Sequence, residues 1–367
     1  EPRRYNHASS FNHIDIHKYI KYTNSQTIVV NRINECDERK NTKGLNSYLM
    51  NVSDIADHTV FISDWLKNLF ITYGFGDSNH SVIRNGANKE FFNFDNKKLS
   101  TNKIKIVTHH WGRDTNKGFN IYKKIDRLLE DESFKQKFDF TFIGNLPKDF
   151  YFKNTKIISP LFGKKLGEEL RKHDIYITGS IFEPAGMHHI EGAMSGLPIL
   201  YVNSGGVTEY CKNYGLEYSS EDLLIKLGEI VENYDLYIER LKRYEFTGET
   251  MNHNYLNLFE NLMMNKNEIL GNRKNFNSNY FKKLNKCLRL NSSSVAVPKV
   301  ISKNRQISPT YFNPLWGPTL KNNSFFQGNS FVTAISSGSI HSIDLIAGFQ
   351  PFPKELWLDY FDHWLFL

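Results

Sequence analysis

The sequence predicts an α/β protein built on parallel sheets, and three observations carry that prediction. Short β-branched runs alternate with helical stretches from residue 26 to about residue 265, which is the pattern of strand–helix units around a parallel sheet. The composition agrees, because 40% apolar and 14% aromatic residues are enough to bury a large core and exclude a disordered chain. The polar segment 96–102 interrupts the pattern and suggests two sheets rather than one.

The expected elements follow the chain in a regular order. The strands are short runs rich in β-branched or aromatic residues: 27–30, 59–62, 103–108, 138–144, 155–159, 174–178 and 198–202. Helices are expected between them, near 45–56, 64–72, 117–132, 164–173 and 187–195, and then over 221–265.

A basic linker is expected over residues 266–290. Segment 271–289 carries six basic residues and no acidic one, and apolar side chains recur at every fourth position, which is typical of an amphipathic helix. Two interpretations stay open. The helix docks on an anionic membrane face, or it is a solvated linker that packs on its neighbour.

Length, hydropathy and charge exclude other classes of protein. At 367 residues the chain is long enough for two or three domains. The mean hydropathy is -0.49 and no apolar run reaches the roughly 18 to 20 residues that cross a bilayer, so we expect a water-soluble protein. The net charge of +7 comes from interleaved rather than clustered cations, which argues against a nucleic-acid partner and fits nucleotide ligands or a membrane surface equally.

The cysteines and the chain ends add two expectations. Cys36, Cys211 and Cys287 are far apart and form no Cys-x-x-Cys or Cys/His pattern, so neither a disulfide framework nor a zinc site is expected, and a reducing cytoplasm fits. The chain opens on EPRRYNH and stops in the aromatic run ELWLDYFDHWLFL, which leads us to expect a truncated protein.

The most informative stretch is SIFEPAGMHHIEGAMSGLPILYVNSGGVTEYC, residues 180–211. A strand ends at its start, a Glu-Pro-Ala-Gly turn follows, and a helix begins near Gly186. The backbone N–H groups and the positive dipole end of such a helix bind phosphate. Glu183 lies in the turn and Glu191 lies eight positions further, so we expect both carboxylates to face a ligand at the helix start, where they suit sugar and ribose hydroxyls.

These residues resemble a retaining glycosyltransferase of the GT-B fold, family 4 type, whose hallmark is a Glu, seven residues and a second Glu. The order of the strand-ending Ser, the Gly-Leu-Pro and the Ser-Gly-Gly at 204–206 agrees with that family. The resemblance implies two Rossmann-like domains and a nucleotide-sugar donor as co-substrate. It implies no metal and no other cofactor.

The segment WGRDTNKGFNIYKKID, residues 111–126, resembles the family loop that supplies cations to the donor diphosphate. Lys117 matches that loop and is expected at the first turn of a helix, where its ammonium would neutralise the β-phosphate. The alternative is a surface lysine beside a turn. Gly112 and Arg113 belong to the same loop, although Arg113 lies four rather than the usual five positions before the lysine.

The resemblance also implies residue roles. Glu191 would bind the ribose hydroxyls and Glu183 would contact the donor sugar. The amides of Gly186 and Met187, together with Lys117, would hold the diphosphate. The chemistry would be electrostatic support of the leaving nucleoside diphosphate while the glycosidic carbon becomes cation-like, with retention of anomeric configuration.

Other residues near these motifs are less specific. Gly144 occupies the place where the family brings its backbone close to the nucleotide base, and a turn that needs a positive φ is an equal alternative. His188, near Glu191, is expected to contact the donor. The pairs His109/His110 and His188/His189 do not predict a metal site, because adjacent residues point apart and no third ligand is apparent.

The front of the family pattern is incomplete. VIRNGANKEFF, residues 82–92, resembles the Asn-Gly hinge between the two domains, yet 84 residues precede Asn85 and the Gly-rich acceptor loop of the family is missing. Four polar side chains of the preceding segment face an acceptor or simply solvate a loop, and we do not choose between these. They are Arg32, Asp37, Arg39 and Lys43.

The last 77 residues resemble part of a family 2 rhamnosyltransferase-like enzyme with the GT-A fold. In DYFDHW, Asp362 would be the catalytic base and Asp359 its neighbour. The Asp-x-Asp site that should precede this segment does not occur, so the segment is not expected to be active alone. The alternative is a carboxy-terminal cap with ordinary surface carboxylates.

The sequence therefore predicts a partial acceptor domain (1–95), a donor domain (96–265), a basic linker helix (266–290) and a partial GT-A-like segment (291–367). The expected function is a cytoplasmic hexosyltransferase that uses a nucleotide-sugar donor and a glycan or lipid-linked acceptor in surface polysaccharide synthesis. Peripheral contact with the inner face of a membrane is an option. A GT-B-like nucleotide-sugar epimerase and a non-catalytic nucleotide-sugar-binding module remain the alternatives.

Overall fold

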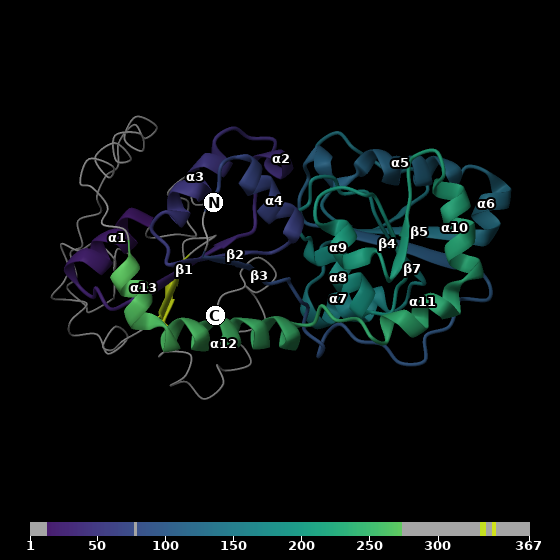
Figure 1. The fold of residues 1–367 in the computed structure, drawn as a ribbon. Coiled ribbons are helices and arrows are strands. Elements are labelled where there is room, and N and C mark those ends of the chain that lie inside the picture. Colours follow the sequence, from purple (N-terminus) through teal and green to yellow (C-terminus); the bar gives the residue numbers. More distant parts are fainter. Residues whose placement is uncertain (1–12, 77–78, 274–330, 335–339, 343–367) are drawn as a thin grey trace, which may run out of the picture.

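A computed structural model describes residues 13–76, 79–273, 331–334 and 340–342 of the chain. Within them the protein forms two α/β units side by side, each built on one sheet (Figure 1). All the strand pairings in these residues are parallel except that of the two last strands. The expected α/β class with two sheets is confirmed.

The first sheet has five strands. Their order is Ile340–Ser342 (β11), Phe331–Ala334 (β10), Ile28–Ile33 (β1), His58–Phe61 (β2) and His80–Val82 (β3). The helices that precede or connect these strands are His13–Tyr22 (α1), Asp37–Lys40 (α2), Leu45–Ser53 (α3) and Asp64–Thr72 (α4).

The second sheet has six strands. Their order is Lys156–Ile158 (β6), Phe138–Gly144 (β5), Ile104–His110 (β4), Ile175–Thr178 (β7), Ile199–Tyr201 (β8) and Gly215–Glu217 (β9). The helices around it are Phe119–Leu128 (α5), Glu132–Lys137 (α6), Gly163–Leu170 (α7), Met187–Met194 (α8), Val207–Cys211 (α9), Leu223–Glu232 (α10) and Tyr234–Leu241 (α11). Two further helices, Gly248–Met264 (α12) and Lys266–Asn272 (α13), follow in the last part of the described range 79–273.

Both sheets are covered on their two faces, which is why central strands such as β1, β7 and β8 are buried along their whole length. In the first sheet Val30 and Val60 pack on α12, whereas Ile33 and Phe61 point to the opposite face, toward α3 and α4. In the second sheet one face packs on α5 and α10 and the other on α7, α8 and α11. Alternate residues of a strand point to opposite faces, so each strand contributes to both cores.

The chain crosses between the units twice at one place. Gly86 lies on the first crossing and Thr247 on the second, and a Cβ on Gly86 would lie 2.0 Å from the Thr247 carbonyl oxygen. The neighbouring residue Ala87 forms an isolated bridge with Thr247 and accepts a hydrogen bond from the Gly248 N–H at 2.8 Å. The Asn-Gly segment therefore lies at the junction of the units, where the sequence analysis expected the hinge, and glycine is needed for the close approach.

The segment 248–264 differs from its expected place. The sequence analysis included it in the donor unit, whereas Met251, Phe259 and Leu262 of α12 pack on β1 and β2 of the first unit. Figure 1 shows α12 running back along the first sheet from the second unit. Its amino end is capped by the Thr247 hydroxyl, which accepts from the Thr250 N–H at 3.2 Å.

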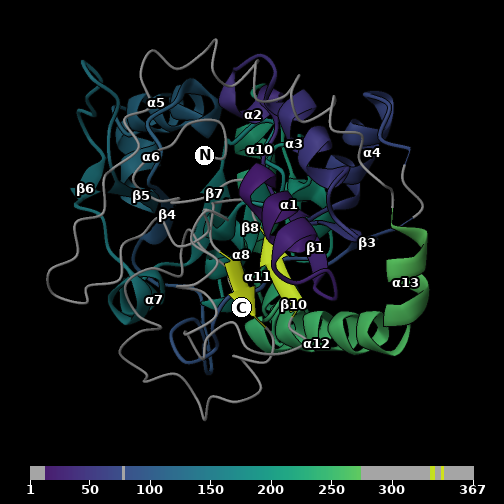
Figure 2. The same ribbon diagram turned by 90° about the vertical axis from the view of Figure 1, so that its left-hand side faces the viewer.

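Two strands from near the end of the chain also join the first unit. The sequence analysis placed residues 331–334 and 340–342 in a separate GT-A-like segment, but β10 pairs in parallel with β1 and β11 extends the same sheet. Figure 2 shows β10 next to β1. The pairing satisfies the backbone groups of β1 on the side away from β2, which would otherwise form an open sheet edge.

Of the basic linker expected over 266–290, the structure describes only the first residues, 266–273. There α13 covers Lys266–Asn272, and the remainder of the amphipathic segment lies outside the described residues, as do all other residues of the GT-A-like segment. In the part of the chain that the structure covers, no helix combines the length and the apolar character needed to cross a membrane.

Candidate functional site

Three loops of the second unit meet at the carboxyl edge of its sheet, on the side that faces the first unit (Figure 1). They follow the neighbouring strands β4, β7 and β8, and they comprise residues 111–118, 179–186 and 203–206. This edge is the usual ligand-binding edge of an open α/β sheet. The first unit reaches it through α2, because the Asn116 side-chain amide donates to the backbone carbonyls of Glu38 (3.1 Å) and Arg39 (3.0 Å).

Glu183 is the carboxylate at the centre of this region, and it is 5% exposed. Its Oε2 lies 2.5 Å from the Lys117 ammonium, and its Oε1 lies 2.9 Å from Nε of Arg39. Burial alone would raise the pKa of Glu183, but the two cations outweigh it and hold that pKa well below its ordinary range. Glu183 is therefore ionised, and its ion pairs join the two units.

The loop after β8 fixes the backbone around Glu183. The Ser204 hydroxyl accepts a hydrogen bond from the Phe182 N–H at 2.8 Å, and the Gly206 N–H donates to the Glu183 carbonyl at 2.8 Å. Gly205 has φ +69°, and a Cβ there would lie 2.3 Å from the same carbonyl oxygen. The Ser-Gly-Gly sequence is therefore explained by its contact with the turn that carries Glu183.

Lys117 is buried beneath the loop that follows β4, with 6% exposure. It ends a 3₁₀ turn, Thr115–Lys117 (η1), and does not lie in the first turn of a helix as expected. The reason is Gly118, which has φ +86° and approaches Gly179 so closely that a Cβ would lie 2.4 Å from its carbonyl carbon. The alternative of a surface lysine is wrong, and Gly112 lies above the Lys117 side chain.

Helix α8 begins directly beyond the turn. Gly186 precedes it with φ +69°, and a Cβ there would lie 2.8 Å from the His188 ring and 2.9 Å from the Glu183 side chain. Glycine is thus required by both the backbone conformation and the packing. The first amides of the helix, at Met187 and His188, have no earlier helical carbonyl to bind, so this end carries the positive end of the helix dipole.

Glu191 lies in the second turn of α8 and is 3% exposed. Its Oε2 is 2.7 Å from Nε2 of His109, at the end of β4. This carboxylate was expected to face the ligand together with Glu183. In the structure it is bound to a histidine, and its role toward ribose hydroxyls stays a prediction.

Four histidines gather beneath these loops. The rings of His110 and His188 are 4.6 Å apart, and His188 Nε2 lies 2.8 Å from the Thr178 hydroxyl. Burial lowers the pKa of both well below its ordinary value and lowers that of His189 to about 3, so all three are neutral at pH 7. Among the described residues no group of three or more potential ligands is arranged to hold a metal ion.

Of the remaining predicted site residues, Arg113 and Gly144 lie within the described part of the chain. Arg113 is exposed and forms no ion pair within the described chain, and Gly144 has φ +142° with its absent Cβ 2.0 Å from the His110 carbonyl oxygen. The positive φ and the close approach to the end of β4 explain why a glycine ends β5, and the role of Gly144 beside the nucleotide base stays a prediction. Asp359 and Asp362, predicted as neighbour and catalytic base, lie outside the described residues.

The four polar residues left open as acceptor contacts have different environments. Arg32 donates to the Asn85 side-chain oxygen at 2.7 Å, and Asp37 accepts from the N–H groups of residues 44–46. Lys43 is exposed, whereas Arg39 contacts Glu183. The two interpretations left open for Arg39, an acceptor contact and a solvated loop, did not include its contact with Glu183, and no motif pointed to Asn116.

Two Rossmann-like units whose loops meet between them form the GT-B fold, and solved GT-B structures align with the chain. Neither a protein-family model nor a curated protein sequence matches it.

Among the aligned structures, HepE, sucrose-phosphate synthase and TarM each cover 68% of this chain. HepE from Anabaena, in complex with UDP-glucose, has a TM-score of 0.54 and 15% identity over 76% of its own chain. Sucrose-phosphate synthase from Thermosynechococcus elongatus has a TM-score of 0.52 and 13% identity over 72% of its chain. A TarM variant from S. aureus, in complex with UDP and other ligands, has a TM-score of 0.53 and 16% identity over 54% of its chain.

Proposed function

We propose that this chain is a glycosyltransferase that transfers a sugar from a nucleotide-diphosphate sugar to a glycan or lipid-linked acceptor with retention of configuration. The observation that carries the proposal is the ionised, buried carboxylate of Glu183 between Lys117 and the start of α8. A cation and a helix amino end are suited to a diphosphate, and a fixed carboxylate beside them is suited to the sugar.

The proposed chemistry is electrostatic. As the bond to the nucleoside diphosphate breaks, negative charge develops on the leaving oxygen, where Lys117 and the amides of Gly186 and Met187 stabilise it. Positive charge develops on the sugar ring, where the Glu183 carboxylate is favourable. Lys117 contacts Glu183 in this structure, so a bound diphosphate would draw part of the interaction of its ammonium away from the carboxylate. This step needs no metal from the protein.

Two features of the similar structures support the donor class. The HepE structure is a complex with UDP-glucose, and the TarM structure is a complex that includes UDP. We extend this to a nucleotide-sugar donor, with Glu191 as the contact to the ribose and a hexose as the transferred sugar. A role in surface polysaccharide synthesis in the cytoplasm is part of the same proposal.

Three of the four buried histidines, together with Glu183, favour a transferase over the epimerase alternative. An epimerase needs acid and base groups whose pKa lies near the working pH. Burial lowers the pKa of His110, His188 and His189 far below 7, and the two cations keep Glu183 ionised. None of these four groups is suited to exchange a proton with a sugar carbon at neutral pH.

The test combines donor binding with donor cleavage. Thermal shifts with UDP, GDP and dTDP sugars should show stabilisation by one nucleotide class, because a ligand that binds the folded state raises the melting temperature. In Glu183→Gln, which keeps the shape but removes the charge, we expect release of the nucleoside diphosphate to fall about 100-fold or more.

Glu221→Gln, at an exposed carboxylate, is the matched control and should behave as the unmodified protein. If Glu183→Gln binds and cleaves the donor at an unchanged rate, the catalytic role of Glu183 is wrong. Binding without measurable cleavage in the unmodified protein, with every acceptor class tried, would instead support the non-catalytic module.

A further inference from the structure

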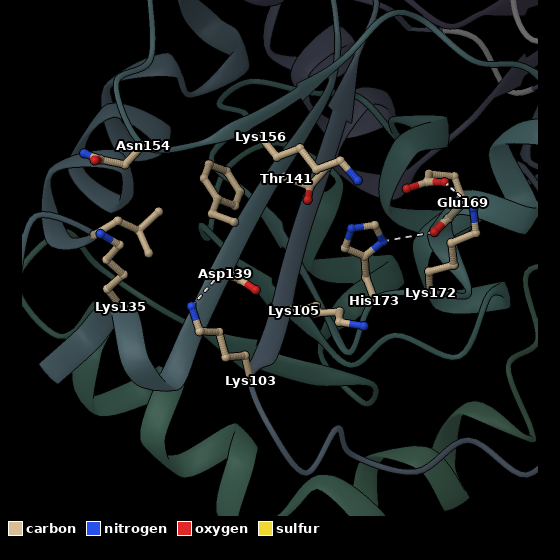
Figure 3. A pocket seen from close by; sticks show the side chains of 12 residues that line it. Lys103, Lys105, Lys135, Asp139, Thr141, Asn154, Lys156, Glu169, Lys172 and His173 are labelled. Atoms are coloured by element: carbon tan, nitrogen blue, oxygen red, sulfur yellow. Dashed lines mark hydrogen bonds and ion pairs between the residues drawn. The ribbon is translucent and has the colours of Figure 1, made fainter. Parts of the chain in front are cut away.

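A cavity of about 410 Å³ lies at the opposite edge of the second sheet from the candidate site (Figure 3). It is formed by the amino ends of β4, β5 and β6 together with the end of α7 and His173. Strand β4 runs from this cavity to the loops of the candidate site, and its seven residues span roughly 20 Å. A ligand in this cavity therefore cannot be the donor held at the carboxyl edge.

Lysine dominates the charge of the cavity. Five lysines line it, whereas two carboxylates do: Lys103, Lys105, Lys135, Lys156 and Lys172 against Asp139 and Glu169. The carboxylates are already used, because Asp139 lies 3.4 Å from the Lys103 ammonium and Glu169 lies 2.7 Å from the Lys172 ammonium. The cavity thus keeps an excess of positive charge.

The excess positive charge comes from the ammonium groups of Lys105 and Lys156, because neither forms an ion pair with a carboxylate within the described residues. The register pairs Lys105 with Asp139 and Lys156 with Thr141, and residues 139 and 141 of β5 point to the same face. The two lysines therefore lie on one face of the sheet, two strands apart and two residues apart along the strand direction, so that their Cα atoms are about 12 Å apart. Two separated cations suit a ligand with two separated anionic groups.

His173 closes the cavity without adding charge. It is 4% exposed, and burial lowers its pKa to about 4, so its ring is neutral at pH 7. One ring nitrogen, Nδ1, lies 2.9 Å from the Glu169 carbonyl oxygen, which fixes the ring against the end of α7. The backbone N–H of His173 donates to the Leu170 carbonyl at 3.0 Å, so this N–H is not available to a ligand in the cavity.

The shape and chemistry of the cavity indicate the class of ligand. Lysine ammonium groups are point charges on flexible stems that bind phosphate oxygens without a fixed planar geometry. The volume is that of a small-molecule site rather than a single ion. The apolar residues that line it, Leu129 and Phe140, are buried and cannot enter a bilayer as a membrane-docking face would require.

We propose that this cavity is a second anion site that binds a small molecule with two or more phosphate groups, independently of the donor site.

The test uses inorganic tripolyphosphate and the full chain. Calorimetric titration should show binding that is about tenfold weaker or more in Lys105→Gln/Lys156→Gln, because two charge-assisted contacts are lost. The matched control is Lys148→Gln/Lys212→Gln, which removes two exposed lysines outside the cavity and should leave the affinity unchanged. Lysine acetylation read by mass spectrometry should show that tripolyphosphate protects Lys105 and Lys156.

Lys117→Gln separates this site from the donor site, because binding at the cavity should survive that substitution. The proposal is overturned if Lys105→Gln/Lys156→Gln binds tripolyphosphate within twofold of the unmodified protein, or if Lys117→Gln abolishes all binding. It is also overturned if tripolyphosphate does not bind while phosphatidylglycerol vesicles, and not phosphatidylcholine vesicles, sediment the protein through Lys105 and Lys156. That result would assign the cavity to a lipid surface.

Discussion

His189 is fully buried near the start of α8, and neither of its ring nitrogens has a hydrogen-bond partner among the described residues. Its ring lies against Gly186 and 5.6 Å from the Tyr210 ring. An unpaired buried polar group costs about 1–3 kcal/mol. Such a residue works against the stability of the fold, and its cost depends on pH.

The pH dependence follows from the lowered pKa. Burial lowers the pKa of His189 from about 6.5 in the unfolded chain to about 3 in the fold. Below pH 6.5 the unfolded chain binds a proton that the folded chain does not, so the free energy of unfolding decreases as the pH falls from 6.5 toward 3.

We therefore expect His189→Phe to raise the free energy of unfolding by about 1–3 kcal/mol at pH 7.5, and by more at pH 5. Urea unfolding at the two pH values measures this difference. His253→Phe replaces an exposed histidine and is the control, with no comparable gain at either pH. A loss of stability in His189→Phe that is equal at both pH values would show that the ring has polar partners in solution.

Glu183 and Lys117 could be predicted from the sequence because a local motif identifies each of them. The contact of Glu183 with Arg39 could not, since the two residues are 144 positions apart and belong to different units. The sequence also gave no reason to pair Glu191 with His109, because that hydrogen bond depends on how α8 packs against the end of β4. A local motif thus identifies single candidate residues, whereas the side chains that contact them are set by the tertiary fold.

At the scale of elements, β1, β2 and β4 to β8 were predicted within a few residues, whereas β3, β9, β10 and β11 were not. β3 (HSV) and β9 (GLE) are half-exposed at sheet edges and carry little apolar pattern, whereas the equally short edge strand β6 (KII) was predicted because two of its three residues are isoleucine. The helix expected from residue 117 begins at Phe119, because the close approach of Gly118 to Gly179 is a tertiary constraint. A strand shows a clear apolar sequence pattern where it is buried, so the half-exposed strands β3 and β9 show little of that pattern.

The end of α13 is held to the first unit by Arg273. Its Nε and Nη2 lie 2.8 Å and 2.6 Å from the two oxygens of Asp57, and its guanidinium also donates to the carbonyls of Ser25 and Thr27. Asp57 is buried and accepts a further hydrogen bond from the Val29 N–H at 2.7 Å. One of the six basic residues of the predicted amphipathic segment is therefore a structural anchor.

We expect Arg273→Ala to lower the free energy of unfolding by about 3 kcal/mol, because it leaves a buried carboxylate without its cation. Hydrogen exchange should increase in β1 and α13 and stay unchanged in the second sheet. Arg243→Ala, at an exposed arginine without an ion pair in the described chain, is the control. Asp57→Asn should recover part of the loss in the Arg273→Ala background, and purely additive losses would contradict the direct pairing.

At the scale of the whole molecule, the two units contact each other through charged groups as well as through the crossings at Gly86 and Thr247. Asp64 and Trp65 donate their backbone N–H groups to the Glu209 carboxylate at 2.9 Å and 2.6 Å. Arg84 lies 2.9 Å from the same carboxylate. Glu209, from α9 of the second unit, thereby binds the amino end of α4 in the first, where an anion is favourable.

Glu209→Ala should therefore loosen the units relative to each other without unfolding either one. The amides of Asp64 and Trp65 lose their acceptor, while the Ser63 hydroxyl still caps α4 by accepting from the Leu66 N–H. We expect a larger radius of gyration in small-angle scattering, faster exchange of those two amides, and a cost of about 1.5–3 kcal/mol for the charged hydrogen bonds. Glu221→Ala is the control. Unchanged scattering with faster exchange would mean that Glu209 stabilises α4 only. The arrangement of the units would then depend on the two crossings and on the Arg39–Glu183 ion pair.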